Sequence, residues 1–264
     1  MKKLRIVGVI PARLGSQRLA RKVLREFHGR ILIEHVYRRV EKSTLLAELW
    51  IATDSEEVLQ ACEKRKIPAL LTSDQHASGT DRIHEVMKKK RADIYVNIQG
   101  DEPLVRPEHL KILLQPFLSR RDVPVATLMT RMDPREAMSP NVVKVVTDSQ
   151  GWALYFSRSP IPFNRDGREP HLIYKHLGFY AYTAKALEKF HALPPSRLEQ
   201  SERLEQLRLL ENGIPIFVSE TSFDTIGVDT EEDLQRVAGL LTKETNSPKT
   251  LRARSSISGR KQGV

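Results

Sequence analysis

Short apolar runs alternate with amphipathic stretches through the first half of the chain. Four continuous apolar runs predict strands at residues 5–10, 49–53, 69–72 and 94–98. Apolar residues at helical spacing predict helices at residues 32–43, 55–64, 81–90 and 107–118. Buried strands separated by helices are typical of a mostly parallel sheet covered on both faces. Ligands of such sheets bind at the carboxyl ends of the strands, so we expect a site in the loops that follow them.

The second half has shorter links between its apolar runs. The pattern predicts strands at residues 123–130, 142–147, 152–157, 177–182 and 216–220. It predicts helices at residues 200–211 and 230–241. Short links favour antiparallel pairing, because parallel strands need a long crossover. We therefore expect one α/β domain over residues 1–242, with a mostly parallel mixed sheet and a smaller inserted antiparallel sheet.

The composition indicates a globular protein of a reducing compartment. The chain has 264 residues, of which 40% are hydrophobic. No apolar run approaches the roughly 20 residues of a membrane-spanning helix. Cys62 is the only cysteine, so no disulfide can form within the chain, and we expect a cytoplasmic location.

The formal net charge of +10 is concentrated toward the end of the sequence. Residues 243–264 carry Lys243, Lys249, Arg252, Arg254, Arg260 and Lys261 against the single acid Glu244. Such a polar, serine-rich segment predicts a disordered tail. A solvated tail accounts for the charge, and weak attachment to RNA or to an acidic membrane surface is the alternative.

A basic loop follows the first predicted strand, over residues 11–22. It places Arg13, Arg18, Arg21 and Lys22 beside Gly15. Guanidinium groups bind phosphate oxygens through paired hydrogen bonds, and lysine supplies a mobile charge. The loop matches neither a Walker A loop nor a dinucleotide fingerprint. It predicts a triphosphate-binding loop of another kind, with a solvated surface loop as the alternative.

Acidic side chains follow two other predicted strands. Asp101 and Glu102 come after residues 94–98, and Asp229 comes before the last predicted helix. Mg²⁺ prefers one or two carboxylates together with substrate phosphates and water. The alternatives are an acidic turn at Asp101 and a helix cap at Asp229.

These features occur in an order that resembles the 3-deoxy-manno-octulosonate (Kdo) cytidylyltransferase family, from about residue 5 to 240. The matching segments are Arg13-x-x-Ser16-x-Arg18-Leu19-x-x-Lys22, residues 52–54, 78–82, 97–103, 153–158, 175–178, 204–208 and 227–230. The resemblance implies a Rossmann-like nucleotidyltransferase fold, a homodimer, and transfer of CMP from CTP to Kdo, with Mg²⁺ as the cofactor and pyrophosphate released. The product, CMP-Kdo, supplies lipopolysaccharide synthesis.

The resemblance also assigns roles to individual residues. Metal binding and catalysis would fall to Asp101 and Asp229, with Lys22 as the catalytic cation. The nucleotide would contact Arg13, Ser16, Arg18, Lys22, Ser78, Gly79 and Gln99. The sugar would contact Arg82, Arg158, His176, Tyr180, Glu205 and Gln206. From the residues alone, the pattern favours an ordinary buried or surface histidine at His176 and plain strand packing at Tyr180.

The chain departs from the family pattern in the basic loop. Family members usually carry Pro-Gly before the loop lysine and a second proline after it, where this chain has Ala20, Arg21 and Val23. Glycine adopts positive φ without strain, whereas arginine does not. The open functional alternatives are a related acidic sugar (an amino-substituted Kdo or a sialic acid) and a relative that binds nucleotide without catalysis.

Overall fold

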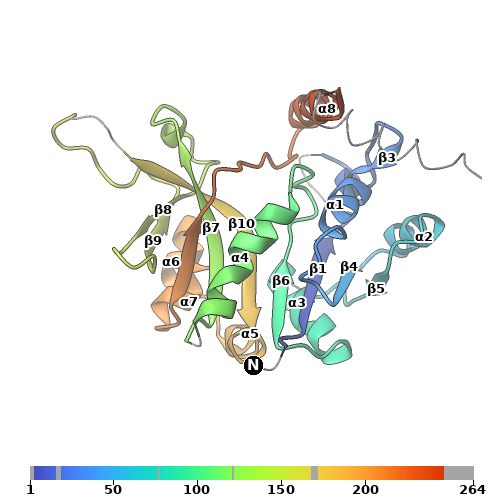
Figure 1. Ribbon diagram of the computed structural model, residues 1–264, viewed down its shortest axis with the longest axis horizontal. Helices are drawn as coiled ribbons and strands as arrows, with labels where there is room; N and C mark the ends of the chain where they lie inside the picture. Colours follow the sequence, from blue (N-terminus) through green and yellow to red (C-terminus); the bar gives the residue numbers. More distant parts are fainter. Residues whose placement is uncertain (1–2, 16–18, 77, 121, 168–171, 247–264) are drawn as a thin grey trace, which may run out of the picture.

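One large sheet forms the centre of the protein (Figure 1). The structure, a computed structural model, describes residues 3–15, 19–76, 78–120, 122–167 and 172–246. Within these residues the sheet has nine strands. They are β1 (Ile6–Ala12), β4 (Glu48–Thr53), β5 (Ala69–Leu71), β6 (Ile94–Asn97), β7 (Val125–Met132), β8 (Lys144–Thr147), β9 (Ala153–Ser157), β10 (Ile173–Thr183) and β11 (Ile216–Glu220).

The strand directions confirm a mixed, mostly parallel sheet. The main path runs β11-β7-β10-β6-β1-β4-β5. Only β10 opposes its neighbours on this path, pairing antiparallel with both β6 and β7. The predicted antiparallel insertion is the hairpin of β8 and β9, and it joins the same sheet where Lys144 pairs with Lys175 of β10.

Helices cover both faces of the sheet. They are α1 (Leu32–Val40), α2 (Glu56–Lys64), α3 (Gly79–Lys89), α4 (Pro107–Ser119), α5 (Ala184–Ala192), α6 (Arg197–Glu202), α7 (Leu207–Glu211) and α8 (Glu231–Asn246). Apolar side chains of α1, α2 and α4 form one core with the sheet, and those of α3, α5 and α7 form a second core with its other face. These two cores are the reason that the strands are apolar on both sides.

A third apolar cluster attaches α8 to the carboxyl ends of the strands (Figure 1). Leu234, Val237 and Leu241 of α8 pack with Leu32 of α1 and with Leu19 of the basic loop. The helix reaches Asn246, beyond the domain boundary expected at residue 242. The remaining tail, residues 247–264, lies outside the described residues. None of the described helices combines the length and the apolar character of a membrane span.

Two local features differ from the expected pattern. The helix expected at residues 200–211 is two helices, α6 and α7, because Arg203 adopts left-handed geometry with φ 53° and ends α6. A hairpin of β2 (Glu26–Phe27) and β3 (Arg30–Ile31) was not predicted. Its turn uses positive φ at His28 and Gly29, which is the geometry of a two-residue type I′ turn.

Candidate active site

A polar cleft of about 490 Å³ lies at the carboxyl ends of β1 and β6. Its lining comes from Pro11, Arg13, Gly15, Lys22, Val23, Gly79, Gln99, Gly100, Asp101 and Asp229. The basic loop, Asp101 after β6 and Asp229 just before α8 are far apart in sequence and meet at the edge of the sheet where a ligand was expected. Pro11, Arg13, Gly15 and Lys22 of the basic loop form a wall of this cleft, while Ala20 and Arg21 are exposed to solvent.

Lys22 lies between the two predicted metal-binding carboxylates. Its Nζ is 2.7 Å from Asp101 Oδ2 and 2.9 Å from Asp229 Oδ1. The Lys22 side chain is only 11% exposed. Burial lowers the pKa of Lys22, but the charges and hydrogen bonds of both carboxylates outweigh it, so the pKa is raised above its ordinary value. The ammonium group is therefore charged at neutral pH.

The Asp229 carboxylate does not serve as a helix cap. Thr230 and Asp233 cap α8 reciprocally: the Asp233 amide donates to Thr230 Oγ1 (3.2 Å) and the Thr230 amide donates to Asp233 Oδ2 (2.9 Å). The Asp229 amide also donates to Asp233 Oδ2 (3.0 Å). These bonds hold the backbone so that the Asp229 carboxylate contacts Lys22.

The donor set fits a magnesium ion that keeps other ligands. Among the described residues no group of three or more His, Cys, Asp or Glu side chains forms a closed metal site. Asp101 and Asp229 supply two carboxylates to one cation, at present the Lys22 ammonium. Two carboxylates completed by water and phosphate oxygens are what Mg²⁺ commonly takes, whereas Zn²⁺ sites use more protein ligands.

Gly100 lets the acidic loop approach the first strand closely. A Cβ atom at Gly100 would lie 2.7 Å from the Pro11 carbonyl oxygen and 2.9 Å from Ile33 Cδ1. Neither position leaves room for a methyl group, so only glycine brings Asp101 this near the basic loop.

Arg13 lines the same space, and its Nη2 atom is buried without a hydrogen-bond partner among the described residues. A buried guanidinium nitrogen without a partner is suited to an anion. Ser16 and Arg18 lie outside the described residues.

The first turn of α3 forms the wall between this cleft and a second group of polar side chains. Ser78 Oγ accepts from the Asp81 amide, and Asp81 Oδ2 accepts from the Ser78 amide, each at 3.1 Å. Thr80 Oγ1 donates to Glu205 Oε2 at 2.7 Å. The capped helix thus presents Gly79 to the cleft while Thr80 joins it to Glu205.

The second group lies on the sheet face that α3 and α5 cover. Three of its buried polar atoms have no hydrogen-bond partner among the described residues: Asn97 Oδ1, the Tyr180 hydroxyl and Gln206 Nε2. Asn97 pairs with Tyr180 across β6 and β10. Burial raises the pKa of Tyr180 well above its ordinary value; the neighbouring Tyr182 and Glu205 add to the effect, and Thr127 acts against it. Buried groups without partners are costly, so this cluster is suited to a polyhydroxylated ligand.

A hydrogen bond to β10 fixes the orientation of the Gln99 side chain. Its Nε2 donates to the Gly178 carbonyl oxygen at 3.1 Å. A Cβ atom at Gly178 would lie 3.3 Å from Gln99 Cγ, so the glycine makes room for the amide. The Glu102 side chain is directed away from the Lys22 ammonium, and its Oε2 accepts a hydrogen bond from Thr225 Oγ1 at 2.6 Å. Loss of hydration raises the pKa of Glu102 to about 7, against the effect of the Thr225 hydrogen bond.

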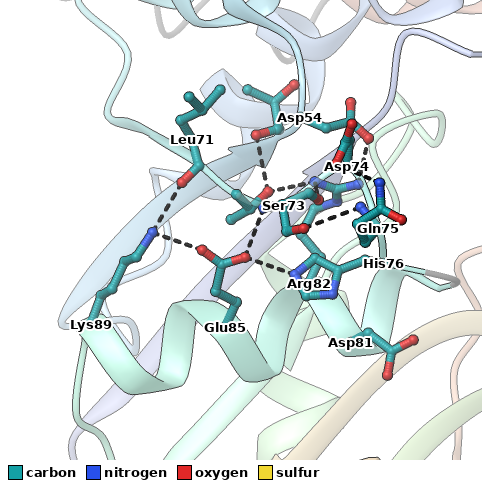
Figure 2. A network of polar contacts seen from close by, with 12 residues as sticks. Asp54, Leu71, Ser73, Asp74, Gln75, His76, Asp81, Arg82, Glu85 and Lys89 are labelled. Atoms are coloured by element: carbon teal, nitrogen blue, oxygen red, sulfur yellow. Dashed lines mark hydrogen bonds and ion pairs between the residues drawn. The ribbon is translucent and has the colours of Figure 1, made fainter.

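Arg82 does not contact the sugar region, contrary to expectation. Its side chain is fully buried. Figure 2 shows it at the centre of a polar network: the guanidinium donates to Asp54 Oδ2 (2.6 Å), Thr72 Oγ1 (2.5 Å) and the Ser73 carbonyl (3.2 Å). Arg82 therefore ties α3 to the ends of β4 and β5 through its two Nη atoms, while its buried Nε has no hydrogen-bond partner among the described residues.

Arg158 is also committed to other partners. Its Nε donates to the Glu202 carbonyl oxygen (2.7 Å), Nη1 to that of Pro140 (2.8 Å) and Nη2 to that of Arg203 (3.3 Å). These carbonyls include the end of α6, where a cation is favourable. Arg158 holds the turn before Glu205 in place, and the expectation that it binds sugar directly is not supported by this geometry.

Arg21 occupies the loop position where family members usually have glycine, and it adopts left-handed geometry with φ 54°. This conformation costs a non-glycine residue about 1 kcal/mol or more. Arg21 forms an ion pair with Glu57 of α2, which offsets part of that cost. The chain thus keeps the backbone path that glycine favours while carrying a different side chain.

Sequence reasoning missed two residues of the second group. Asn97 is a polar residue that ends the otherwise apolar strand β6, and that change in polarity was a usable signal. Thr127 is fully buried in β7 and contacts His176. Threonine is common in strands, so its position in the sequence carried no such signal.

Comparisons with known proteins agree with this geometry. The cytidylyltransferase family model matches residues 7–221. A 3-deoxy-manno-octulosonate cytidylyltransferase of Koribacter versatilis (strain Ellin345) is 54% identical over 235 residues, which are 89% of each chain. One from Escherichia coli is 45% identical over 238 residues, covering 90% of this chain and 96% of the relative.

Solved structures show the same fold. CMP:2-keto-3-deoxy-manno-octonic acid synthetase complexed with CTP has a TM-score of 0.87 and 46% identity, over 91% of this chain and 99% of that one. A 4-diphosphocytidyl-2C-methyl-D-erythritol synthase from Anaerococcus prevotii DSM 20548, at 18% identity and a TM-score of 0.59, covers 91% of this chain and 97% of that chain and shares the fold alone. Fold, cleft and family model together define a cytidylyltransferase. Within that class, the chain belongs to the 3-deoxy-manno-octulosonate cytidylyltransferase family.

Proposed function

We propose that this enzyme transfers CMP from CTP to the anomeric hydroxyl of Kdo, producing CMP-Kdo for lipopolysaccharide synthesis and releasing pyrophosphate. The observation that carries the proposal is the pairing of Lys22 with Asp101 and Asp229 in a cleft beside a cluster of unsatisfied polar atoms. The first part fits a triphosphate with its cation. The second fits a sugar, and family membership supports this assignment.

The nucleotide lies in the cleft, with its triphosphate along the basic loop. The unpaired Nη2 of Arg13 binds a phosphate oxygen, and Lys22 neutralises charge as pyrophosphate leaves. Ser78 and Gly79 present the amino-terminal end of α3 to the nucleotide, where amide groups favour an anion. Gln99 offers its amide oxygen toward the base, since its nitrogen is bonded to Gly178. Ser16 and Arg18 lie outside the described residues, and the family resemblance alone assigns them further phosphate contacts.

The sugar lies against the second polar group. The Tyr180 hydroxyl and Gln206 Nε2 are unpaired donors, and Asn97 Oδ1 is an unpaired acceptor. Burial raises the pKa of Glu205, with hydrogen bonds from Ser78 and Thr80 acting against it. The Tyr180 hydroxyl, Gln206 Nε2 and His176 bind the hydroxyls and the carboxylate of the sugar. Arg82 and Arg158 do not take this part, because they have other partners. The group holds the anomeric hydroxyl in line with the α-phosphate, and such positioning supplies much of the catalysis.

Asp101 and Asp229 are the residues that hold Mg²⁺. When bound, the ion polarises the α-phosphate and the attacking hydroxyl. In addition, Lys22 and Arg13 neutralise negative charge on the phosphates. The first turn of α3 aligns the nucleotide with the sugar.

We propose also that the enzyme is a homodimer of the cytoplasm, where CTP is available. Four large apolar side chains between residues 138 and 172, the segment that contains the β8–β9 hairpin, are exposed: Met138 (72%), Leu154 (63%), Phe163 (85%) and Leu172 (47%). Exposed apolar groups gathered in one region commonly mark an interface. Light scattering of the wild type and of Leu154→Glu tests this assignment, since the variant should be monomeric.

Pyrophosphate release from CTP tests the activity, with Kdo, an amino-substituted Kdo and a sialic acid as acceptors. We expect release with Kdo and at least a hundredfold loss in Asp101→Asn, whereas Lys42→Met, an exposed change, retains activity. Preference for another acceptor would replace Kdo as the substrate. Release with none of the three would overturn the proposed function.

A further inference from the structure

A bulge interrupts β10 beside the second polar group. The register with β7 passes from Leu177 opposite Leu128 directly to Tyr180 opposite Thr127. Gly178 and Phe179 therefore have no opposing residue on β7. Bulges of this kind redirect side chains and release backbone groups from the ladder.

Thr127 holds this bulge from within the core. Its side chain is fully buried, and Oγ1 lies 2.7 Å from the Phe179 carbonyl oxygen and 3.2 Å from that of Leu177. A carbonyl oxygen only accepts, so the single hydroxyl proton of Thr127 points to this pair. Toward any third partner the Thr127 oxygen has only lone pairs to offer.

The third partner is His176. Its Nε2 lies 3.1 Å from Thr127 Oγ1. Because the hydroxyl proton is already donated to the backbone, Nε2 must carry the proton in this contact. In a neutral imidazole the other nitrogen, Nδ1, is then an acceptor. No described residue is hydrogen-bonded to Nδ1.

The His176 ring is also fixed in orientation. Its centroid is 5.0 Å from the Phe156 ring, edge to face, and 5.4 Å from the Tyr180 ring. Burial, with a smaller contribution from the Lys175 charge, lowers the pKa of His176 to about 3. The imidazole is thus neutral across the physiological range and supplies no positive charge to the carboxylate of a sugar acid.

We propose that Thr127 is a positioning residue that holds His176 as the Nε2–H tautomer, so that Nδ1 accepts a hydrogen bond from a hydroxyl of the acidic sugar. This inference rests on the proposed function. It gives His176 the task of recognising a donor group on the sugar and leaves the carboxylate to other residues. Thr127 itself touches no substrate.

Thr127→Val and Thr127→Ser test the proposal, because valine has the shape of threonine without its hydroxyl and serine restores the hydroxyl. Thr127→Val should raise the KM for Kdo about tenfold, the effect of one hydrogen bond, and change the KM for CTP less than twofold. Thr127→Ser should return the KM for Kdo to within about twofold of the wild type. Thr130→Val, which removes another buried hydroxyl from β7, should change neither constant.

Nitrogen-15 NMR of the His176 ring provides a second measurement, on the wild-type protein. We expect a protonated Nε2 and an unprotonated Nδ1 from pH 6 to 8. A protonated Nδ1 would overturn the proposal even if Thr127→Val did not fold. Equal increases in both KM values, or no rescue by serine, would also overturn it while wild-type activity left the proposed function intact.

Discussion

The Lys22 ammonium occupies the charge position that a metal ion would take, so removing it should strengthen metal binding to the nucleotide-free protein. Both carboxylates that contact Lys22 are the proposed metal ligands. In the nucleotide-free state a cation must therefore compete with Lys22 for Asp101 and Asp229. Lys22→Met keeps most of the apolar stem and removes the charge.

The magnitude follows from the distances and the exposure. Two unit charges about 4 Å apart interact by about 4 kcal/mol at an effective dielectric constant near 20. The carboxylates of Asp101 and Asp229 are 31% and 40% exposed. Water and salt therefore screen a large part of the repulsion between the Lys22 ammonium and a bound metal ion. We take about 1.4 kcal/mol as the net effect, which is a tenfold change in Kd.

Titration of nucleotide-free protein with Mn²⁺, followed by electron paramagnetic resonance, measures this affinity directly. Lys22→Met should bind about tenfold more tightly than the wild type, and Asp101→Asn should bind more weakly. Lys42→Met removes the same charge from an exposed position and should bind like the wild type. Unchanged or weaker binding by Lys22→Met would refute the competition between lysine and metal.

Three further experiments test other parts of the structure. Glu85 accepts from Lys89, His76 and the Ser73 amide, and these bonds outweigh desolvation and lower its pKa to about 2. Its stabilising effect is therefore complete above its ordinary pKa of about 4.5 and is lost as the pH falls toward 2. Glu85→Gln should lower Tm by about 2 °C at pH 7, after allowance for screening, and by less at pH 3; equal shifts in calorimetry would contradict this. Gly100→Ala should cost about 1–3 kcal/mol in chemical denaturation because its Cβ meets backbone, and a neutral result would refute the close approach. Arg21→Gly should stabilise the fold by about 1 kcal/mol and, with Ala20→Pro, lower the KM for CTP; an unchanged KM would show that the departure from the family loop does not weaken nucleotide binding.

Much of the fold follows from local patterns, because apolar runs and helical spacing are properties of neighbouring residues. Strand β11 matches its expected bounds, and the first four predicted strands are all present. The break at Arg203 was missed because a left-handed arginine has no signature in the sequence. The convergence of the basic loop with Asp101 was predictable from strand order in α/β sheets.

The hydrogen-bond partners of individual side chains were less predictable than the positions of the residues. Arg82 and Arg158 belong to matching motifs, yet the Nη2 of Arg82 is bonded to Asp54 and the guanidinium of Arg158 to backbone carbonyls. A motif shows that a residue type is present and not which of several nearby partners it takes. Thr127 was missed for the same reason, since its contact with His176 depends on a bulge that only the three-dimensional pairing creates.

The contact between Lys22 and Asp229 spans 207 positions of the chain. During synthesis on the ribosome, the basic loop and the carboxylate at Asp101 emerge long before their partner. Until the segment carrying Asp229 has been translated and has docked, a growing chain lacks one of the two carboxylates of the proposed cation site. Acquisition of activity should therefore be a late event that reports completion of nearly the whole fold.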